Sequence, residues 1–178
     1  MNSYCLFCNT NKCEQIAALL PQKVACTAFS PKIVQRKWVK GKCHEEMRTY
    51  LPGYVFFFTE EVLTDMRGLF SLDGVLRLLG RREEGYRLRG DDERFARMIL
   101  ESDGVIGILK VYQAGERIRL TDSVFSGVTG EILRVDRRKG RAQIKVRFDE
   151  KEFLIWAGYE LLESCPAEPD EIETGQKA

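Results

Sequence analysis

The sequence predicts an α+β protein in which a ferredoxin-like (split βαβ) domain is followed by a small all-β barrel. Two observations predict this class. Over residues 1–103, strand and helix patterns alternate in the order β-α-β-hairpin-β-α-β-α, typical of an antiparallel sheet with helices on one face. From residue 114 onward there are only short strands separated by glycine turns, which is typical of a small barrel.

The strands of the first domain follow from apolar runs bounded by turn residues. They are expected at residues 4–8, 24–29, 32–39, 45–50, 54–59, 75–79 and 85–88. Lys40-Gly41-Lys42 is expected to form the tip of a hairpin between the third and fourth strands. The run from Tyr54 to Phe58 is apolar at every position, so we expect a central strand that is covered on both faces.

The helices of the first domain follow from apolar residues at helical spacing. They are expected over residues 12–20, 60–69 and 93–102. Asn11 can cap the first helix and Pro21 ends it. Asp91 or Asp92 is expected to cap the last helix. The side chains of Val62, Met66 and Leu69 are expected to point inward from the middle helix.

The second half of the chain divides into three segments. Residues 104–113 are expected to be a linker, although their apolar residues also suit a strand. Residues 114–163 contain the predicted barrel, with strands at 117–120, 130–135, 141–148, 152–156 and 159–162. Residues 164–178 are polar and acidic with two prolines, which predicts a disordered tail.

Positive charge is concentrated on one predicted hairpin of the barrel. The chain as a whole has a net charge of +1, yet residues 134–147 hold seven cations and one acid, Asp136. The seven cations are Arg134, Arg137, Arg138, Lys139, Arg141, Lys145 and Arg147. Ala142, Ile144, Val146 and Phe148 alternate with polar residues, so one face should pack while the other meets solvent or a partner. A packed face backed by a cationic face suits a phosphate backbone.

Several classes of function find little support. No apolar run is long enough to span a membrane, and the N-terminus does not read as a secretory signal, so we expect a cytoplasmic protein. Cys5, Cys8 and Cys13 loosely match zinc spacing, but residues three apart on a strand point to opposite faces, so we expect reduced core thiols and no metal. His44 beside Cys43 lacks an acidic partner, and no enzyme or cofactor site is expected.

Two separated motifs, one at residues 50–56 and one within residues 114–132, together resemble the NusG family of transcription factors. Tyr50-Leu51-Pro52-Gly53-Tyr54-Val55-Phe56, after a hairpin and before a strand that ends at Leu78-Leu79-Gly80, is similar to the Phe-Pro-Gly-Tyr-Val segment of the family's N-terminal domain. The segments 114–118 and 125–132 are similar to the KOW motif, which occurs in small SH3-like barrels. The order of the two motifs matches the family over residues 3 to about 163.

The resemblance implies a monomeric protein that docks on the clamp helices of RNA polymerase. The residues carried over by position for this contact are Tyr4, Leu51, Tyr54, Phe56 and Leu78, although all of these also suit a plain core. The family places residues 32–42 near upstream or non-template DNA. The residues carried over there are Lys32, Arg36, Lys37, Trp38 and Lys40, and Trp38 serves either as a stacking platform or as a side chain tucked onto the domain.

The cationic hairpin tip is most similar to the LoaP branch of specialised antiterminators. That resemblance implies that the barrel binds a hairpin in the nascent leader RNA and gives processive antitermination on long operons. The alternative is a housekeeping NusG that modulates pausing and couples to Rho or the ribosome. Two interpretations remain: the cations form a soluble surface that also touches protein, or the chain is a KOW-containing RNA-binding or ribosome-associated protein without polymerase contact.

Overall fold

The computed structural model describes residues 1–114, 117–120 and 131–162, and it combines β-sheets with a few helices, as expected. The disordered tail expected at 164–178, and most of the second KOW segment, lie outside these residues. Short 3₁₀ helices accompany the main elements at Thr10–Lys12, Leu20–Gln22, Arg67–Ser71, Arg82–Glu84 and Arg137–Lys139. Among the described residues, no helix has the length and apolar character needed to cross a membrane.

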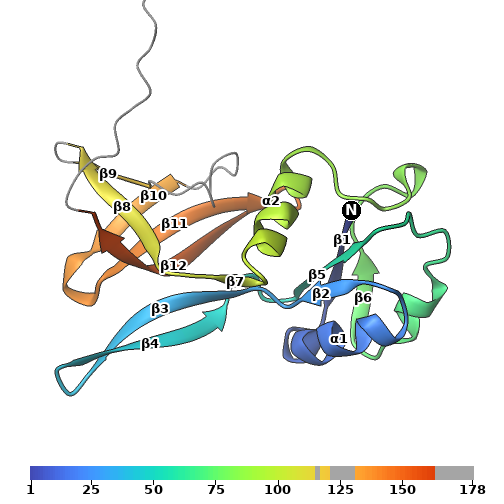
Figure 1. Ribbon diagram of the computed structural model, residues 1–178, viewed down its shortest axis with the longest axis horizontal. Coiled ribbons are helices and arrows are strands. Elements are labelled where there is room, and N and C mark those ends of the chain that lie inside the picture. Colours follow the sequence, from blue (N-terminus) through green and yellow to red (C-terminus); the bar gives the residue numbers. More distant parts are fainter. Residues whose placement is uncertain (115–116, 121–130, 163–178) are drawn as a thin grey trace, which may run out of the picture.

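The N-terminal part of the chain is built on a four-stranded sheet in the order β2-β5-β1-β6 (Figure 1). Its strands are β1 (Asn2–Cys8), β2 (Thr27–Phe29), β5 (Tyr54–Thr59) and β6 (Val75–Leu78). All its pairings are antiparallel, with Tyr4 opposite Phe57 in the central pair. The hairpin of β3 (Lys32–Val39) and β4 (Lys42–Thr49) forms a second sheet with β7 (Val105–Ile106).

The central strand β5 divides the core of this part in two. Every side chain of β5 is buried, and successive side chains point to opposite faces. Val55 and Phe57 pack with Ile16 of α1 (Cys13–Leu19). Tyr54 and Phe56 pack with Phe95 of α2 (Gly90–Glu101). The expectation that the helices share one face is therefore wrong, because a strand that is apolar on both sides needs cover on both.

The C-terminal sheet has five strands in the order β10-β11-β12-β8-β9. Its strands are β8 (Leu109–Ala114), β9 (Arg117–Leu120), β10 (Glu131–Asp136), β11 (Arg141–Phe148) and β12 (Lys151–Leu161). The two strands expected at 152–156 and 159–162 are a single strand, β12. The segment 104–113, expected to be a linker, instead contains β7, which pairs with β3, and most of β8, which pairs parallel to β12.

One core joins the N-terminal part to the C-terminal sheet. Ala142, Ile144, Val146 and Phe148 of β11 are all buried, which confirms the predicted alternation. The ring of Phe148 lies 4.9 Å from that of Phe56, 5.0 Å from Phe95 and 5.4 Å from Tyr54, measured between centroids. The aromatic face of β5 is therefore completed by a residue from the C-terminal sheet.

Two elements expected from the sequence do not form. Residues 60–66 are not helical, and only a 3₁₀ helix at Arg67–Ser71 follows them. The Asp65 carboxylate accepts the backbone N–H of Arg67 at 2.9 Å, a local bond that competes with an α-helix. The strand expected at 85–88 is absent because Gly85 and Tyr86 both adopt positive φ angles, of 65° and 58°, which are incompatible with a strand.

The helix ends also differ from the expectation. Helix α1 begins at Cys13 and lacks a side-chain cap, so Asn11 does not cap it. Helix α2 begins at Gly90, and Asp91 and Asp92 lie within its first turn instead of capping it. Acidic residues in that turn still interact favourably with the positive end of the helix dipole.

Truncation of Phe148 tests the shared core. The Phe148→Ala variant should lose about 3–5 kcal/mol of unfolding free energy, because it leaves a cavity among three aromatic rings. Urea denaturation followed by circular dichroism measures this loss. Phe70→Ala is the matched control, since Phe70 is 52% exposed and should cost less than about 0.5 kcal/mol. Equal losses in the two variants would contradict the shared core.

Candidate functional site

The cationic segment forms a β-hairpin, as predicted, with a 3₁₀ helix at its tip. The carboxylate of Asp136 accepts the backbone N–H of Lys139 at 3.1 Å and the Nε–H of Arg141 at 3.4 Å. Gly140 then closes the tip with a left-handed φ of 60°, a conformation that costs glycine little. The single acid among the seven cations therefore folds the tip and leaves most of the positive charge exposed.

The seven cations of this hairpin divide into two groups. Arg141 pairs with Asp136 and lies 4.5 Å over the ring of Trp156, and Lys145 pairs with Glu152 at 3.8 Å. The other five are exposed, and no ion pair of their side chains occurs within the described residues. These five are Arg134, Arg137, Arg138, Lys139 and Arg147. We refer to them as the open cations.

The β3–β4 hairpin carries the second group of candidate residues. Lys32 pairs with Glu14, and Lys37 lies 3.9 Å from Glu46. Lys40 stands in the turn with a φ of 50°. Trp38 is 53% exposed, so the interpretation in which it is tucked onto the domain is wrong.

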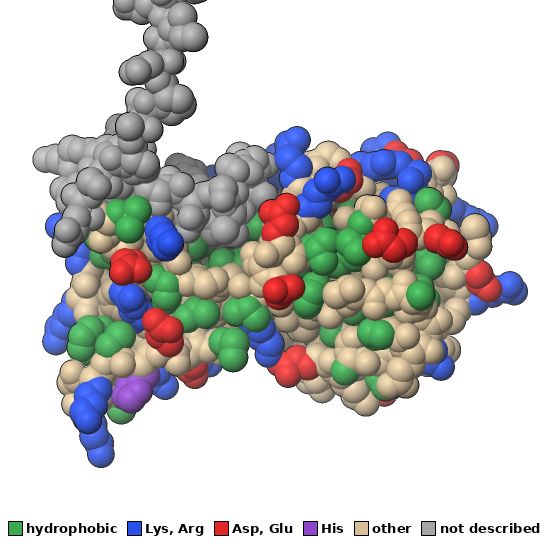
Figure 2. Space-filling view, in the orientation of Figure 1, with side chains coloured by type: hydrophobic (Ala, Val, Ile, Leu, Met, Phe, Trp, Pro, Cys, Tyr) green, Lys and Arg blue, Asp and Glu red, His purple; other side chains and the backbone are tan. Residues whose placement is uncertain are grey.

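The two basic hairpins lie next to each other (Figure 1). Arg36 donates from Nη1 to the carbonyl of Tyr159 at 2.9 Å, and Gln35 donates from Nε2 to the carbonyl of Trp156 at 2.5 Å. A Cβ atom at Gly158 would stand 3.4 Å from the backbone of Arg36 and Val34 and 2.5 Å from Ile108 Cδ1, the end of a side chain that can shift, so β12 packs closely against β3 here. Figure 2 shows Lys and Arg side chains at the end of the β3–β4 hairpin and along the neighbouring edge of the C-terminal sheet.

The five residues carried over for polymerase docking are all buried. Tyr4, Leu51, Tyr54 and Phe56 are at most 2% exposed, and Leu78 is 7% exposed. Tyr4 stacks on Phe57 with the ring centroids 5.1 Å apart, on the α1 side of the sheet. Tyr54 and Phe56 face β11 of the C-terminal sheet. In this arrangement the five side chains belong to the core, so substitutions there would disturb folding as well as any docking.

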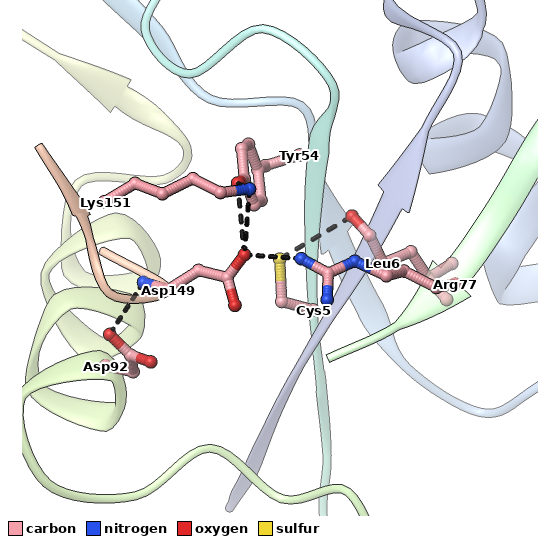
Figure 3. A network of polar contacts seen from close by, with 7 residues as sticks. All are labelled: Cys5, Leu6, Tyr54, Arg77, Asp92, Asp149 and Lys151. Atoms are coloured by element: carbon pink, nitrogen blue, oxygen red, sulfur yellow. Dashed lines mark hydrogen bonds and ion pairs between the residues drawn. The ribbon is translucent and has the colours of Figure 1, made fainter. Parts of the chain in front are cut away.

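A polar network joins the two parts beside the aromatic core (Figure 3). Its centre is Asp149, whose carboxylate contacts Arg77 at 2.6 Å, Tyr54 Oη at 3.3 Å and Lys151 at 3.4 Å. The backbone N–H of Asp149 donates to Asp92 of α2 at 3.1 Å. We refer to these five residues as the interdomain network.

Burial raises the pKa of two groups of the interdomain network. Burial raises the pKa of Asp92, and the neighbouring carboxylate of Asp149 raises it further. Burial also raises the pKa of Tyr54, although the hydrogen bond from Lys151 opposes the shift. A raised pKa favours the neutral form of an acidic group, so this contact disfavours negative charge on Asp92 and on the Tyr54 hydroxyl.

Sequence reasoning missed the interdomain network. Asp149 and Glu150 form a two-residue turn between β11 and β12, with φ angles of 53° and 60°. Glycine or asparagine is the usual signal of such a turn, and neither residue is present here. The available signal was the charge of Asp149 directly after a buried strand, but its partners Arg77 and Asp92 are distant in sequence.

The cysteines do not form a reactive or metal-binding cluster within the described part of the chain. Cys5, Cys8 and Cys13 are buried free thiols. Burial raises the pKa of Cys8 to about 12, which keeps this thiol protonated at neutral pH. No group of three or more His, Cys, Asp or Glu side chains with metal-binding geometry occurs among these residues.

The comparisons with known proteins identify a fold. No family model matches the chain, and no curated protein matches it. A solved structure described as domain interaction in Thermotoga maritima NusG is similar, with a TM-score of 0.51 and 13% sequence identity. The alignment covers 88% of this chain and 93% of that one, so it includes both the N-terminal part and the C-terminal sheet. The chain therefore has a NusG-like fold.

Proposed function

We propose that this protein is a NusG-type transcription elongation factor specialised for antitermination. Its N-terminal part binds RNA polymerase, and its β10–β11 hairpin binds a structured nascent RNA, which gives processive transcription of long operons. The observation that carries this proposal is the cluster of open cations. It occurs on a chain that has a NusG-like fold and a net charge of only +1. The protein acts by binding and does not catalyse a reaction.

RNA suits the hairpin better than a purely protein partner does. Protein interfaces are depleted of charged residues at their centres, whereas the tip of this hairpin presents Arg137, Arg138 and Lys139 in succession. Structured RNA is recognised largely through its shape, its phosphates and its 2′-hydroxyls. Each neutralised phosphate also releases counterions, so several open cations acting together bind strongly at low salt.

Polymerase docking through β5 requires the C-terminal sheet to move away. Tyr54 and Phe56 are covered by Phe148, so no helix can reach them while the two parts are joined. Part of the joining energy comes from the ion pairs of Asp149 with Arg77 and Lys151, whose side chains are about half exposed. Ion pairs of this kind each contribute at most about 1 kcal/mol, so a strong partner can replace them. The similar Thermotoga maritima structure is itself described as one of domain interaction.

Removal of two open cations tests RNA binding. The Arg138→Ala, Lys139→Ala double variant should weaken binding to the leader RNA of the chain's own operon. The slope of log affinity against log salt concentration should fall by about 2, because two phosphate contacts are lost. Fluorescence anisotropy of the labelled RNA over a salt series measures both effects.

The matched control for RNA binding removes two cations elsewhere. Lys23→Ala, Arg67→Ala alters exposed side chains of the N-terminal part and should leave affinity and salt slope unchanged. Equal weakening by both double variants would mean that binding depends on net charge and not on the hairpin. Unchanged binding in the Arg138→Ala, Lys139→Ala variant would refute the RNA face.

Loosening the interdomain network tests polymerase docking. Asp149→Asn keeps a residue that tolerates positive φ but removes the charge that Arg77 and Lys151 contact. A loss of about 1 kcal/mol at this contact should raise the separated fraction, and polymerase capture with it, about fivefold. Pull-down of purified RNA polymerase by the full chain measures this. The control is Glu150→Gln in the same turn, which should capture no more polymerase than the unaltered protein. If Asp149→Asn does not change the amount of polymerase captured, docking at β5 is contradicted.

Antitermination itself is tested by transcription through a terminator in vitro. Readthrough of the terminator should require a template that encodes the leader RNA. The Arg138→Ala, Lys139→Ala variant should give no readthrough on that template. Readthrough that is independent of the leader sequence would instead support the housekeeping role. The template with a scrambled leader is the control.

A further inference from the structure

An open cleft of about 690 Å³ lies where the β3–β4 hairpin meets the tip of the β10–β11 hairpin. One wall is formed by Arg36, Trp38 and Glu45, and the other by Arg137 and Glu160. The hydrogen bond from Arg36 to Tyr159 and the close approach at Gly158 hold these walls together. The cleft therefore exists only while the N-terminal part and the C-terminal sheet are joined.

Strand register places the cleft residues of the β3–β4 hairpin on one face. Arg36 lies opposite Glu45, and Trp38 lies opposite Cys43, so these four side chains share a face of the two-stranded ribbon. Lys37 and His44 form the intervening pair and belong to the other face. The register thus turns an indole, a guanidinium and a carboxylate toward the C-terminal sheet.

Trp38 differs from the other tryptophan of the chain in having an open ring. Trp156 is covered by the guanidinium of Arg141 at 4.5 Å. Trp38 is 53% exposed, and no ring or cation stacks on it within the described residues. A large exposed indole beside cations is a surface on which an unpaired base can stack.

The charges of the cleft favour an unpaired ribonucleotide over a bare phosphate backbone. Two cations, Arg36 and Arg137, are balanced by two carboxylates, Glu45 and Glu160, which repel a row of phosphates. The carboxylates instead accept hydrogen bonds, which base amino groups and ribose 2′-hydroxyls can donate. A nucleotide with its base on Trp38 and its phosphate near an arginine would satisfy both kinds of group.

We propose that this cleft binds an unpaired nucleotide of the RNA, with the base stacked on Trp38. The proposal rests on the proposed RNA contact of the β10–β11 hairpin and extends the site to the β3–β4 hairpin. The open cations then hold the phosphates of the paired stem, and the cleft holds a base from its loop or flank. Occupation of the cleft requires the joined arrangement of the two parts, whereas the open cations remain available to RNA after the parts separate for polymerase docking.

Tryptophan fluorescence tests the cleft directly. The chain has two tryptophans, so the Trp156→Phe full-length variant reports on Trp38 alone. A short unpaired RNA of mixed sequence should quench this fluorescence, and so should a stem-loop RNA. Trp38→Ala in the otherwise unaltered chain should weaken binding about tenfold, as loss of one stacked base does. Val39→Ala, which is 43% exposed on the same strand, is the matched control and should bind normally.

Alkylation of Cys43 provides a second measurement. Cys43 is exposed and lines the cleft, so bound RNA should slow its reaction with iodoacetamide, measured by mass spectrometry of the peptide. Unchanged alkylation together with unquenched Trp38 would overturn the proposal. DNA of the same sequence should protect less, and equal protection would overturn the assignment to RNA.

The outcomes separate the cleft from the proposed function. If stem-loop RNA binds, depends on Arg138 and Lys139, and neither quenches Trp38 nor needs it, then the cleft is refuted and the RNA role stands. If unpaired RNA quenches Trp38 while the Arg138→Ala, Lys139→Ala variant binds structured RNA normally, then the cleft stands and the hairpin face is refuted. Absence of any RNA binding refutes both.

Discussion

The structure depends on one constraint, the strand β5 that buries every one of its side chains. A strand of this kind needs apolar cover on both faces, and the N-terminal part supplies a full cover for only one of them. On the first face, α1 and its neighbours enclose Val55 and Phe57. On the second face, α2 is joined by β11, whose Phe148 fills the space between Phe56 and Phe95. By its association with the N-terminal part, the C-terminal sheet thus supplies the cover that the second face of β5 needs.

This association also determines the distribution of charge. Docking of β12 on β3 brings together two hairpins that are each basic, which costs electrostatic energy in a protein of nearly zero net charge. The cost is reduced by the exposure of the open cations, because water and salt screen charges at the surface. A bound polyanion would offset this electrostatic repulsion between the two hairpins. The arrangement that satisfies the apolar core therefore also prepares the basic surface.

Local patterns in the sequence were sufficient to predict much of the fold and of the cationic hairpin. The alternation from Ala142 to Phe148 predicted β11 and its buried face, and the cationic tip was found with the correct turn. The apolar run of β5 even indicated cover on both faces, yet the helices were assigned to one. The failures share a cause, which is that long-range or local polar contacts outweighed propensity. The hydrogen bond to Asp65 competes with the helix expected at 60–69, and Asp149 contacts Arg77 across 72 residues of sequence. Burial of Tyr54 and Phe56 under Phe148 likewise depends on tertiary contact, which no periodicity reveals.

The completion of the β5 face by Phe148 has a consequence for synthesis on the ribosome. Phe148 is translated about 90 residues after Phe56. At bacterial or eukaryotic elongation rates of about 5–20 residues per second, that interval lasts on the order of 5 to 20 seconds. During this time the nascent chain displays Tyr54 and Phe56, and later also Phe95, without their final partner. An aromatic surface exposed for so long is a natural substrate for chaperones that bind nascent chains. The nascent chain therefore passes through a state whose exposed surface differs from that of the folded protein.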